Sequence, residues 1–132
     1  MIHFETKPLP ARRDVVATDG SDVRLLLSLP GGSMAHFELP PGQVSQAVTH
    51  RTVDEIWFVL SGRGEMWRAQ DGQTESTVQL EAGMCVTIPL STRFQFRSIG
   101  AKALVAVGVT MPPWPGDGEA VLVEGKWPAT VA

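Results

Sequence analysis

The sequence predicts an all-β protein built from short antiparallel strands and tight turns. Gly 13 and Pro 10 make up about a sixth of the 132 residues, a density that interrupts long helices but suits strands joined by turns. A weak helix signal is confined to residues 12–16. Four stretches rich in β-branched or apolar residues are expected to be strands, at 23–29, 56–60, 78–88 and 103–109.

The C-terminal residues 111–132 differ from the rest because they concentrate prolines and two of the four tryptophans. Proline fixes φ and cannot donate to a β-ladder, so residues 112–115 should leave the last barrel strand and cross the surface. Residues 121–123 could return as an edge strand. Trp114 and Trp127 then either pack this tail onto the barrel, close one barrel mouth with it, or lie in a subunit interface.

Charge and cysteine content limit the kinds of partner and the cellular compartment that we expect for this chain. A net charge of -3 argues against nucleic acid or an anionic membrane as partner, since both require clustered cations. No apolar run reaches the length of a membrane span, and residues 1–10 lack the features of a signal peptide. The single Cys85 excludes an internal disulfide, and its apolar neighbours predict that it is buried. We therefore expect a soluble cytoplasmic protein.

Residues 41–67, PGQVSQAVTHRTVDEIWFVLSGRGEMW, carry a spaced motif of Gly42, Val48, His50, Glu55 and Gly62. The spacing resembles the first signature of the cupin superfamily, in which a glycine is followed by His-x-His, a glutamate and a second glycine. Here Val48 stands at the position of the first histidine.

A second stretch continues the resemblance. Gly83, Pro89, Ser91 and Phe94 follow the second cupin signature, except that Ser91 replaces a glycine and Phe94 replaces the final histidine ligand. The resemblance implies a single cupin domain over residues 1–132, a six- to eight-stranded antiparallel β-barrel or jelly roll. Its core would span about 33–110, with 111–132 as an extension. The family's common pairing through edge strands implies a homodimer.

Strand alternation predicts which motif side chains face the barrel interior. If Glu55 points inward, so does Trp57, whereas Ile56 and Phe58 point outward. In the run 93–97, the phenylalanines share the inward face and Arg93, Gln95 and Arg97 the outward one. The expected ligand-binding cavity is apolar around one polar pair, and is built from Gln46, Val48, His50, Glu55, Trp57, Phe94 and Phe96.

A divalent transition metal would need more ligands than this motif supplies. Iron, manganese, nickel or zinc usually take three or four protein nitrogen and oxygen ligands, and the motif offers His50 and Glu55. His36 is the best third ligand if it faces inward. Alternation instead groups Ala35, Phe37 and Leu39 as the buried set, which favours an exposed or rim position for His36.

Three hypotheses of function follow. The first is a cupin that binds a small molecule of unassigned identity. The second is an enzyme: a metal-dependent oxygenase, isomerase or decarboxylase, or a metal-free catalyst in which His50 and Glu55 transfer protons. The pair could also be no more than a satisfied buried hydrogen bond. The chain has no tyrosine, which excludes the histidine–tyrosine mechanism of cupin-like sugar epimerases. The third is a regulatory or interaction module with a vestigial cavity.

Overall fold

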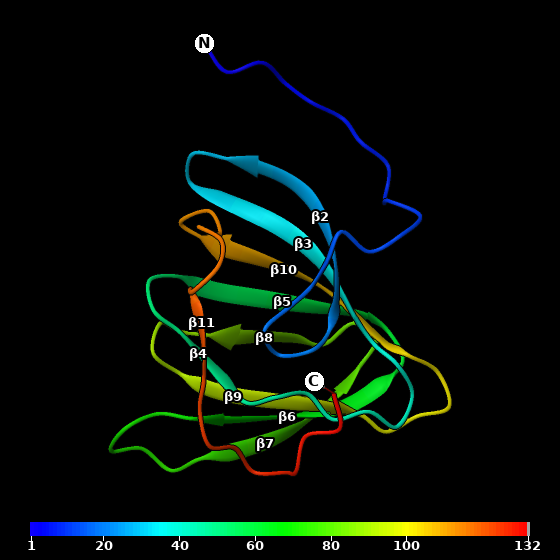
Figure 1. Cartoon of the computed structure of the whole chain (residues 1–132), viewed down its shortest axis with the longest axis vertical. Coiled ribbons are helices and arrows are strands. Elements are labelled where there is room, and N and C mark those ends of the chain that lie inside the picture. The colour runs from blue at the N-terminus through cyan, green and yellow to red at the C-terminus, as the bar shows by residue number, and fades with distance from the viewer. Residues whose placement is uncertain (132) are drawn as a thin grey trace.

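The computed structural model describes residues 1–131, and its regular elements in that range are strands arranged as two facing antiparallel sheets (Figure 1). The larger sheet has the order β1 (Val15–Val16), β2 (Asp22–Leu29), β3 (Gly32–Leu39), β10 (Leu104–Met111), β5 (Asp54–Ser61) and β8 (Cys85–Ile88). The smaller sheet has the order β11 (Ala120–Leu122), β4 (Val48–His50), β9 (Arg93–Ser98), β6 (Arg63–Ala69) and β7 (Ser76–Glu81).

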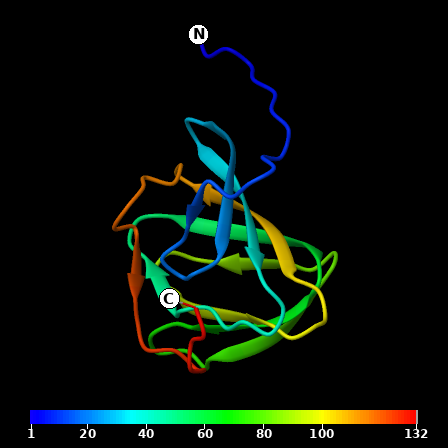
Figure 2. The same cartoon turned by 45° about the vertical axis from the view of Figure 1, so that its right-hand side comes forward.

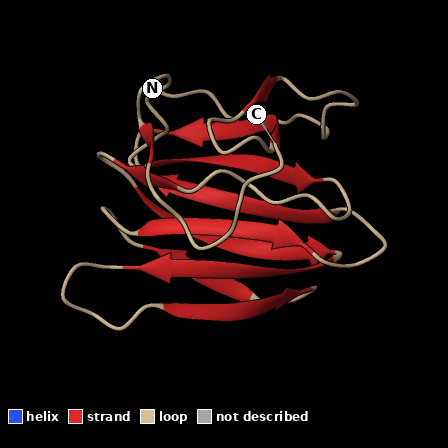
Figure 3. Cartoon of the chain, turned by 60° about the horizontal axis from the view of Figure 1, so that its bottom comes forward, coloured by secondary structure: helices blue, strands red, loops and turns tan. Residues whose placement is uncertain are grey.

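This architecture confirms the predicted all-β jelly roll (Figure 3). Eleven strands are formed within residues 1–131, more than the six to eight expected, because short edge strands extend both sheets. No helix in this range is long and apolar enough to cross a membrane.

One weak signal was not realised, and one local prediction was wrong. Residues 12–16 form no helix; Val15 and Val16 make β1, which pairs with β2. The stretch 78–88 is two strands rather than one, because the chain turns between β7 and β8 through Gly83, whose φ is 92°. That left-handed conformation suits glycine and ends an extended run.

Alternation holds along β5 and β9. Glu55, Trp57 and Val59 are buried while Ile56 and Phe58 are exposed. Phe94 and Phe96 are likewise 1% exposed. The same alternation places Cys85 on the outer face of β8, where it is exposed. The prediction of a buried Cys85 was wrong because its apolar neighbour Val86 points the opposite way, into the core.

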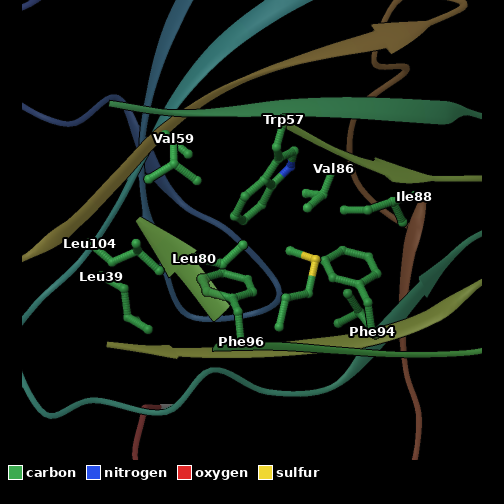
Figure 4. Packing of buried hydrophobic residues seen from close by; sticks show 12 residues of the cluster. Leu39, Trp57, Val59, Leu80, Val86, Ile88, Phe94, Phe96 and Leu104 are labelled. Atoms are coloured by element: carbon green, nitrogen blue, oxygen red, sulfur yellow. The ribbon is translucent and has the colours of Figure 1, made fainter. Parts of the chain in front are cut away.

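The main core lies between the two sheets (Figure 4). Trp57 on β5 reaches across to Phe96 on β9, with ring centroids 4.9 Å apart and planes at 72°, an edge-to-face geometry that aromatic pairs favour. Burial of this cluster supplies most of the driving force for sheet-on-sheet packing. Its buried members are Leu39, Val48, Trp57, Val59, Met66, Leu80, Val86, Ile88, Phe94, Phe96, Leu104 and Ala106.

Ser91, which stands where the second cupin signature has a glycine, adopts a backbone conformation typical of glycine. Ser91 has φ 68°, and no other non-glycine residue among positions 1–131 has a positive φ. This left-handed region is uncommon for residues with a Cβ. The turn geometry therefore accounts for the glycine in the cupin signature, and Ser91 adopts it here.

The C-terminal tail leaves β10 at Met111 and runs beside β4 toward the lower edge of the smaller sheet (Figure 2). The expected return strand is β11, paired with β4 at the sheet edge. Trp127 packs against the cluster of Ala47, Trp67 and Ala69, and the Arg97 guanidinium lies 4.3 Å from the Trp127 ring centroid. Gln95, on the outer face of β9, is 1% exposed because the tail covers it.

Gln95 fastens the tail to the barrel through both ends of its amide. Its Oε1 accepts bonds from the backbone N–H groups of Lys126 and Trp127, each at 2.9 Å. Its Nε2 donates to the carbonyls of Ser45 and Trp127, each at 2.8 Å. One side chain thus satisfies four backbone groups that two distant segments would otherwise leave unpaired.

We predict that Gln95→Ala lowers the free energy of unfolding by roughly 2–4 kcal/mol, since the lost bonds leave buried backbone groups unsatisfied. Urea unfolding measures the loss, and trypsin cleavage after Lys126 should accelerate as the tail detaches. Gln73→Ala, at an exposed position, is the matched control and should change neither readout. Equal proteolysis of the two variants would contradict the anchoring role.

Candidate ligand-binding site

A cavity of about 510 Å³ extends from β1 and β2, where its lining residues Val15, Val16 and Leu25 are exposed, to the inner faces of both sheets and the C-terminal tail. The larger sheet contributes Phe37 from β3, Glu55 and Trp57 from β5, and Gly108 and Thr110 from β10. The smaller sheet contributes His50 and Phe94, and the segments at the mouth add Asp19, Trp114 and Asp117. The cavity therefore gathers residues from distant parts of the sequence.

The structure brings together four of the seven predicted cavity residues: His50, Glu55, Trp57 and Phe94 line the space. Val48 and Phe96 also point inward, but they lie in the packed core rather than at the cavity surface. Gln46 is outside the lining as well, since its Nε2 donates to the Val131 carbonyl at 2.7 Å. These three are corrections: alternation gives the face of a residue, but not its depth along the barrel.

Gly108 leaves room for the side chains that line the cavity, a role not predicted from the sequence. A Cβ at this position would lie 2.7 Å from Phe37 Cε2, 2.8 Å from Glu55 Oε2 and 3.0 Å from Trp57 Cδ1. A glycine inside a strand is a signal of such close approach. Its absent side chain lets Phe37, Glu55 and Trp57 converge on one point.

His50 and Glu55 face each other without a hydrogen bond. His50 Nδ1 lies 3.8 Å from Glu55 Oε1, and the side chains are 5% and 4% exposed. His50 Nδ1 finds no hydrogen-bond partner among the described residues. A satisfied hydrogen bond between the two, one of the predicted alternatives, is therefore wrong at this separation.

Burial keeps both members of this pair uncharged near neutral pH. It lowers the pKa of His50 from 6.5 to about 4, although the Glu119 carboxylate acts in the opposite direction. It raises the pKa of Glu55 from 4.5 to about 8; the Trp57 side chain opposes this increase and Asp19 adds to it. The site thus presents a neutral imidazole beside a protonated carboxyl.

Aromatic rings surround the pair. The His50 ring lies 5.2 Å from Phe94 and 5.1 Å from Trp114, measured between centroids, and meets both edge to face. Phe37 stacks on Trp57 at 5.1 Å with planes at 13°. Trp114 comes from the tail, so of the interpretations offered for the two tail tryptophans, closure of the barrel mouth fits Trp114 and packing of the tail fits Trp127.

Two further carboxylates support the site from its edges. Asp19 is 7% exposed and accepts bonds from Ser21 N at 2.8 Å and Ser21 Oγ at 2.6 Å. Burial raises its pKa, although those bonds oppose the increase. Glu119 accepts bonds from the Thr52 hydroxyl and from the backbone N–H of Thr52 and Val53. It thereby fixes the connection between β4 and β5 that sets His50 opposite Glu55.

His36 does not join His50 and Glu55. It lies on the outer face of β3, between Arg24 of β2 and Val107 of β10, whereas Phe37 faces the cavity. The predicted facing was right, but the expected exposure was wrong: His36 is 6% exposed because it sits in a central strand flanked on both sides. Burial lowers its pKa, and the Arg24 charge lowers it further.

The donor set does not fit a transition metal. Among residues 1–131, no group of three or more His, Cys, Asp or Glu side chains is arranged to hold a metal ion. Val48 and Phe94, at the positions of the two missing ligands, are directly paired across β4 and β9. Two apolar side chains thus occupy the side of the site where two imidazoles would be needed.

Comparison with known proteins agrees with the architecture. The family model described as Cupin domain matches residues 35–110. The sequence has no match among curated proteins.

Three solved structures illustrate the likeness of the fold. Drosophila melanogaster CENP-C bound to CAL1 has a TM-score of 0.63 at 17% identity, over 70% of this chain and 71% of that one. CapF of Staphylococcus aureus, a capsular polysaccharide assembling protein, has a TM-score of 0.72 at 17% identity, over 91% and 35%.

Oxalate decarboxylase of Bacillus subtilis, a protein with Mn(II) centers, has a TM-score of 0.70 at 16% identity, over 85% of this chain and 30% of that one. The chain thus spans about a third of the last two proteins. At these identities the likeness shows the fold alone.

We predict that Glu55→Gln becomes progressively more stable than the unchanged protein as pH rises from 4.5 to about 8. The folded-state pKa of Glu55 lies above its unfolded value, so the unfolded chain loses the proton first and ionisation costs stability across this window. The difference should grow by at most about 1.4 kcal/mol per pH unit. Urea unfolding at a series of pH values measures it.

Glu75→Gln is the matched control for this series because Glu75 is exposed, and its stability difference should stay flat with pH. The lowered pKa of His50 removes stability as pH falls from 6.5 to about 4. That effect is common to both variants and cancels in the comparison. A flat profile for Glu55→Gln would show that Glu55 ionises in the fold without cost.

Proposed function

The chain belongs to the Cupin domain family, and we propose from its site that it binds a small organic molecule with an apolar body in the cavity around His50 and Glu55. The fold itself does not decide the activity, since folds of this kind host many functions. The observation that carries the proposal is an aromatic cavity with only a few convergent polar groups.

The size and lining of the cavity suit such a ligand. Small-molecule pockets usually have volumes of about 300–1,000 Å³ and mostly apolar walls, and this one measures about 510 Å³. Phe37 and Trp114 present accessible ring surface, backed by the buried Trp57 and Phe94, so an aromatic or aliphatic body would be desolvated there. His50 and Glu55 are placed to fix the polar end of the ligand.

Acid–base catalysis without a metal is the second candidate. It is favoured by the juxtaposition of a protonated carboxyl and a neutral imidazole at 3.8 Å. A substrate held between them could receive a proton from Glu55 and donate one to His50. This role requires the binding function and adds a chemical step to it.

The interaction-module hypothesis has less support. CENP-C has been solved bound to another protein, CAL1, but that likeness concerns the fold. Homodimer formation and a cytoplasmic location stay predictions made from the sequence.

The tail tryptophans provide a matched test of binding. We predict that Trp114→Ala abolishes the rise in Tm that binding fragments give the unchanged protein, because Trp114 lines the cavity. Trp127→Ala should lower Tm by loosening the tail but keep the ligand-induced rise, since Trp127 packs outside the cavity. A thermal-shift screen with aromatic fragments of mixed charge measures both.

Two results would contradict the proposal. One is a screen in which no fragment raises the Tm of the unchanged protein. The other is a set of hits that survive Trp114→Ala but are lost in Trp127→Ala, which would place binding on the tail face instead.

A further inference from the structure

Apart from His50, the ionisable side chains that line the cavity all carry acid groups. Asp19, Glu55 and Asp117 contribute to the lining, whereas no lysine or arginine of residues 1–131 does so. His50 is the remaining titratable group of the lining, and its pKa of about 4 leaves it neutral. Glu119, just behind His50, adds another carboxylate. An anionic ligand would therefore find no cationic side chain here, whereas a cationic one would find acid groups that can ionise beside it.

The cavity walls also suit a cation. Phe37, Trp57, Phe94 and Trp114 come from β3, β5, β9 and the tail, so several elements contribute aromatic walls. Aromatic faces attract ammonium groups through their quadrupoles, with tryptophan the strongest. Trp57 and Phe94 occupy the same interior region in Figure 4, and their centroids are 6.5 Å apart. A cation here would thus lie among aromatic rings and acid groups.

Two buried polar atoms at the site lack partners. His50 Nδ1 and Trp57 Nε1 are buried and make no hydrogen bond among the described residues. A neutral imidazole nitrogen can accept a bond from an ammonium N–H, and the indole N–H can only donate. The Trp57 side chain favours the ionised form of Glu55. An ammonium N–H of a ligand would satisfy His50 Nδ1, and the indole N–H of Trp57 would find an acceptor in Glu55 once that carboxyl is ionised.

From these three features we propose that the ligand is an organic cation, an amine or quaternary ammonium group carried on an apolar body. The inference rests on the proposed binding function and narrows its ligand class. The cation lies against Glu55 and within reach of His50, while the apolar body occupies the aromatic part of the cavity.

Binding of a cation changes the protonation of Glu55. Without ligand, burial and the nearby Asp19 keep the carboxyl protonated at neutral pH. A cation beside it favours the carboxylate, so the O–H bond of Glu55 breaks and its proton passes to solvent. Ligand cation and carboxylate then form a neutral pair. Proton release on binding is thus a signature that binding of a neutral molecule would lack.

The affinity test uses three probes of similar body and different charge: phenethylamine, phenethyl alcohol and hydrocinnamate. Isothermal titration calorimetry at neutral pH measures each with the full chain. We expect phenethylamine to bind about tenfold or more tightly than the alcohol, and hydrocinnamate to bind weakest. If the alcohol binds as tightly as the amine, or tighter, the cation inference fails and small-molecule binding stands. If no probe binds and the fragment screen also finds none, both fail.

The proton test repeats the phenethylamine titration in two buffers of different ionisation enthalpy. The unchanged protein should release on the order of one proton or less per amine bound. Glu55→Gln should release none and lose most of its preference for amine over alcohol. Glu75→Gln, the exposed control, should match the unchanged protein. Tight amine binding without proton release in the unchanged protein would overturn the placement of the cation against Glu55.

Discussion

The contact between Trp57 and the phenylalanines of β9 is the interaction on which the rest of the molecule depends. Trp57 and Phe94 belong to the core that joins the two sheets and also to the lining of the cavity. On the core side they exclude water and hold the sheets together. On the cavity side they form a rigid wall beside Glu55. Stability and recognition therefore share the same side chains, and the site is held by the packing that stabilises the fold.

Much of this fold could be predicted from sequence because its signals are local. The alternation along β5 and β9 identifies their inward residues, and the glycine-spaced motifs place the turns. The break between β7 and β8 was harder to predict from the sequence, since apolar residues continue on both sides of Gly83. Cys85 was assigned to the core from its neighbours, although alternation points it outward. The burial of Gln95 depends on tail residues 31 and 32 positions later in the chain, so local patterns could not predict it.

The candidate site was predictable only in part, for a related reason. His50, Glu55, Trp57 and Phe94 share two motifs, and their facing follows from strand parity. Phe37, Asp19 and Trp114 come from segments that only the tertiary fold brings to the cavity. Parity also cannot separate Phe94, which borders the cavity, from Phe96, which lies in the core. Gly108 was the one distant residue with a readable signal, a glycine within a strand.

The replacements at Val48 and Phe94 explain why the remaining pair has unusual electrostatics. The two positions are cross-strand partners, so the changes fall on one continuous patch beside His50. Two imidazoles there would have drawn a metal whose charge keeps Glu55 ionised and His50 deprotonated. A valine and a phenylalanine instead remove water without supplying charge, and desolvation then favours the neutral form of each group. No lysine or arginine of the described lining stands beside this acid. A positive charge that enters the cavity meets a carboxyl positioned to release its proton, so the proposed cationic ligand would supply the positive charge that a metal ion supplies where the ligand set is complete.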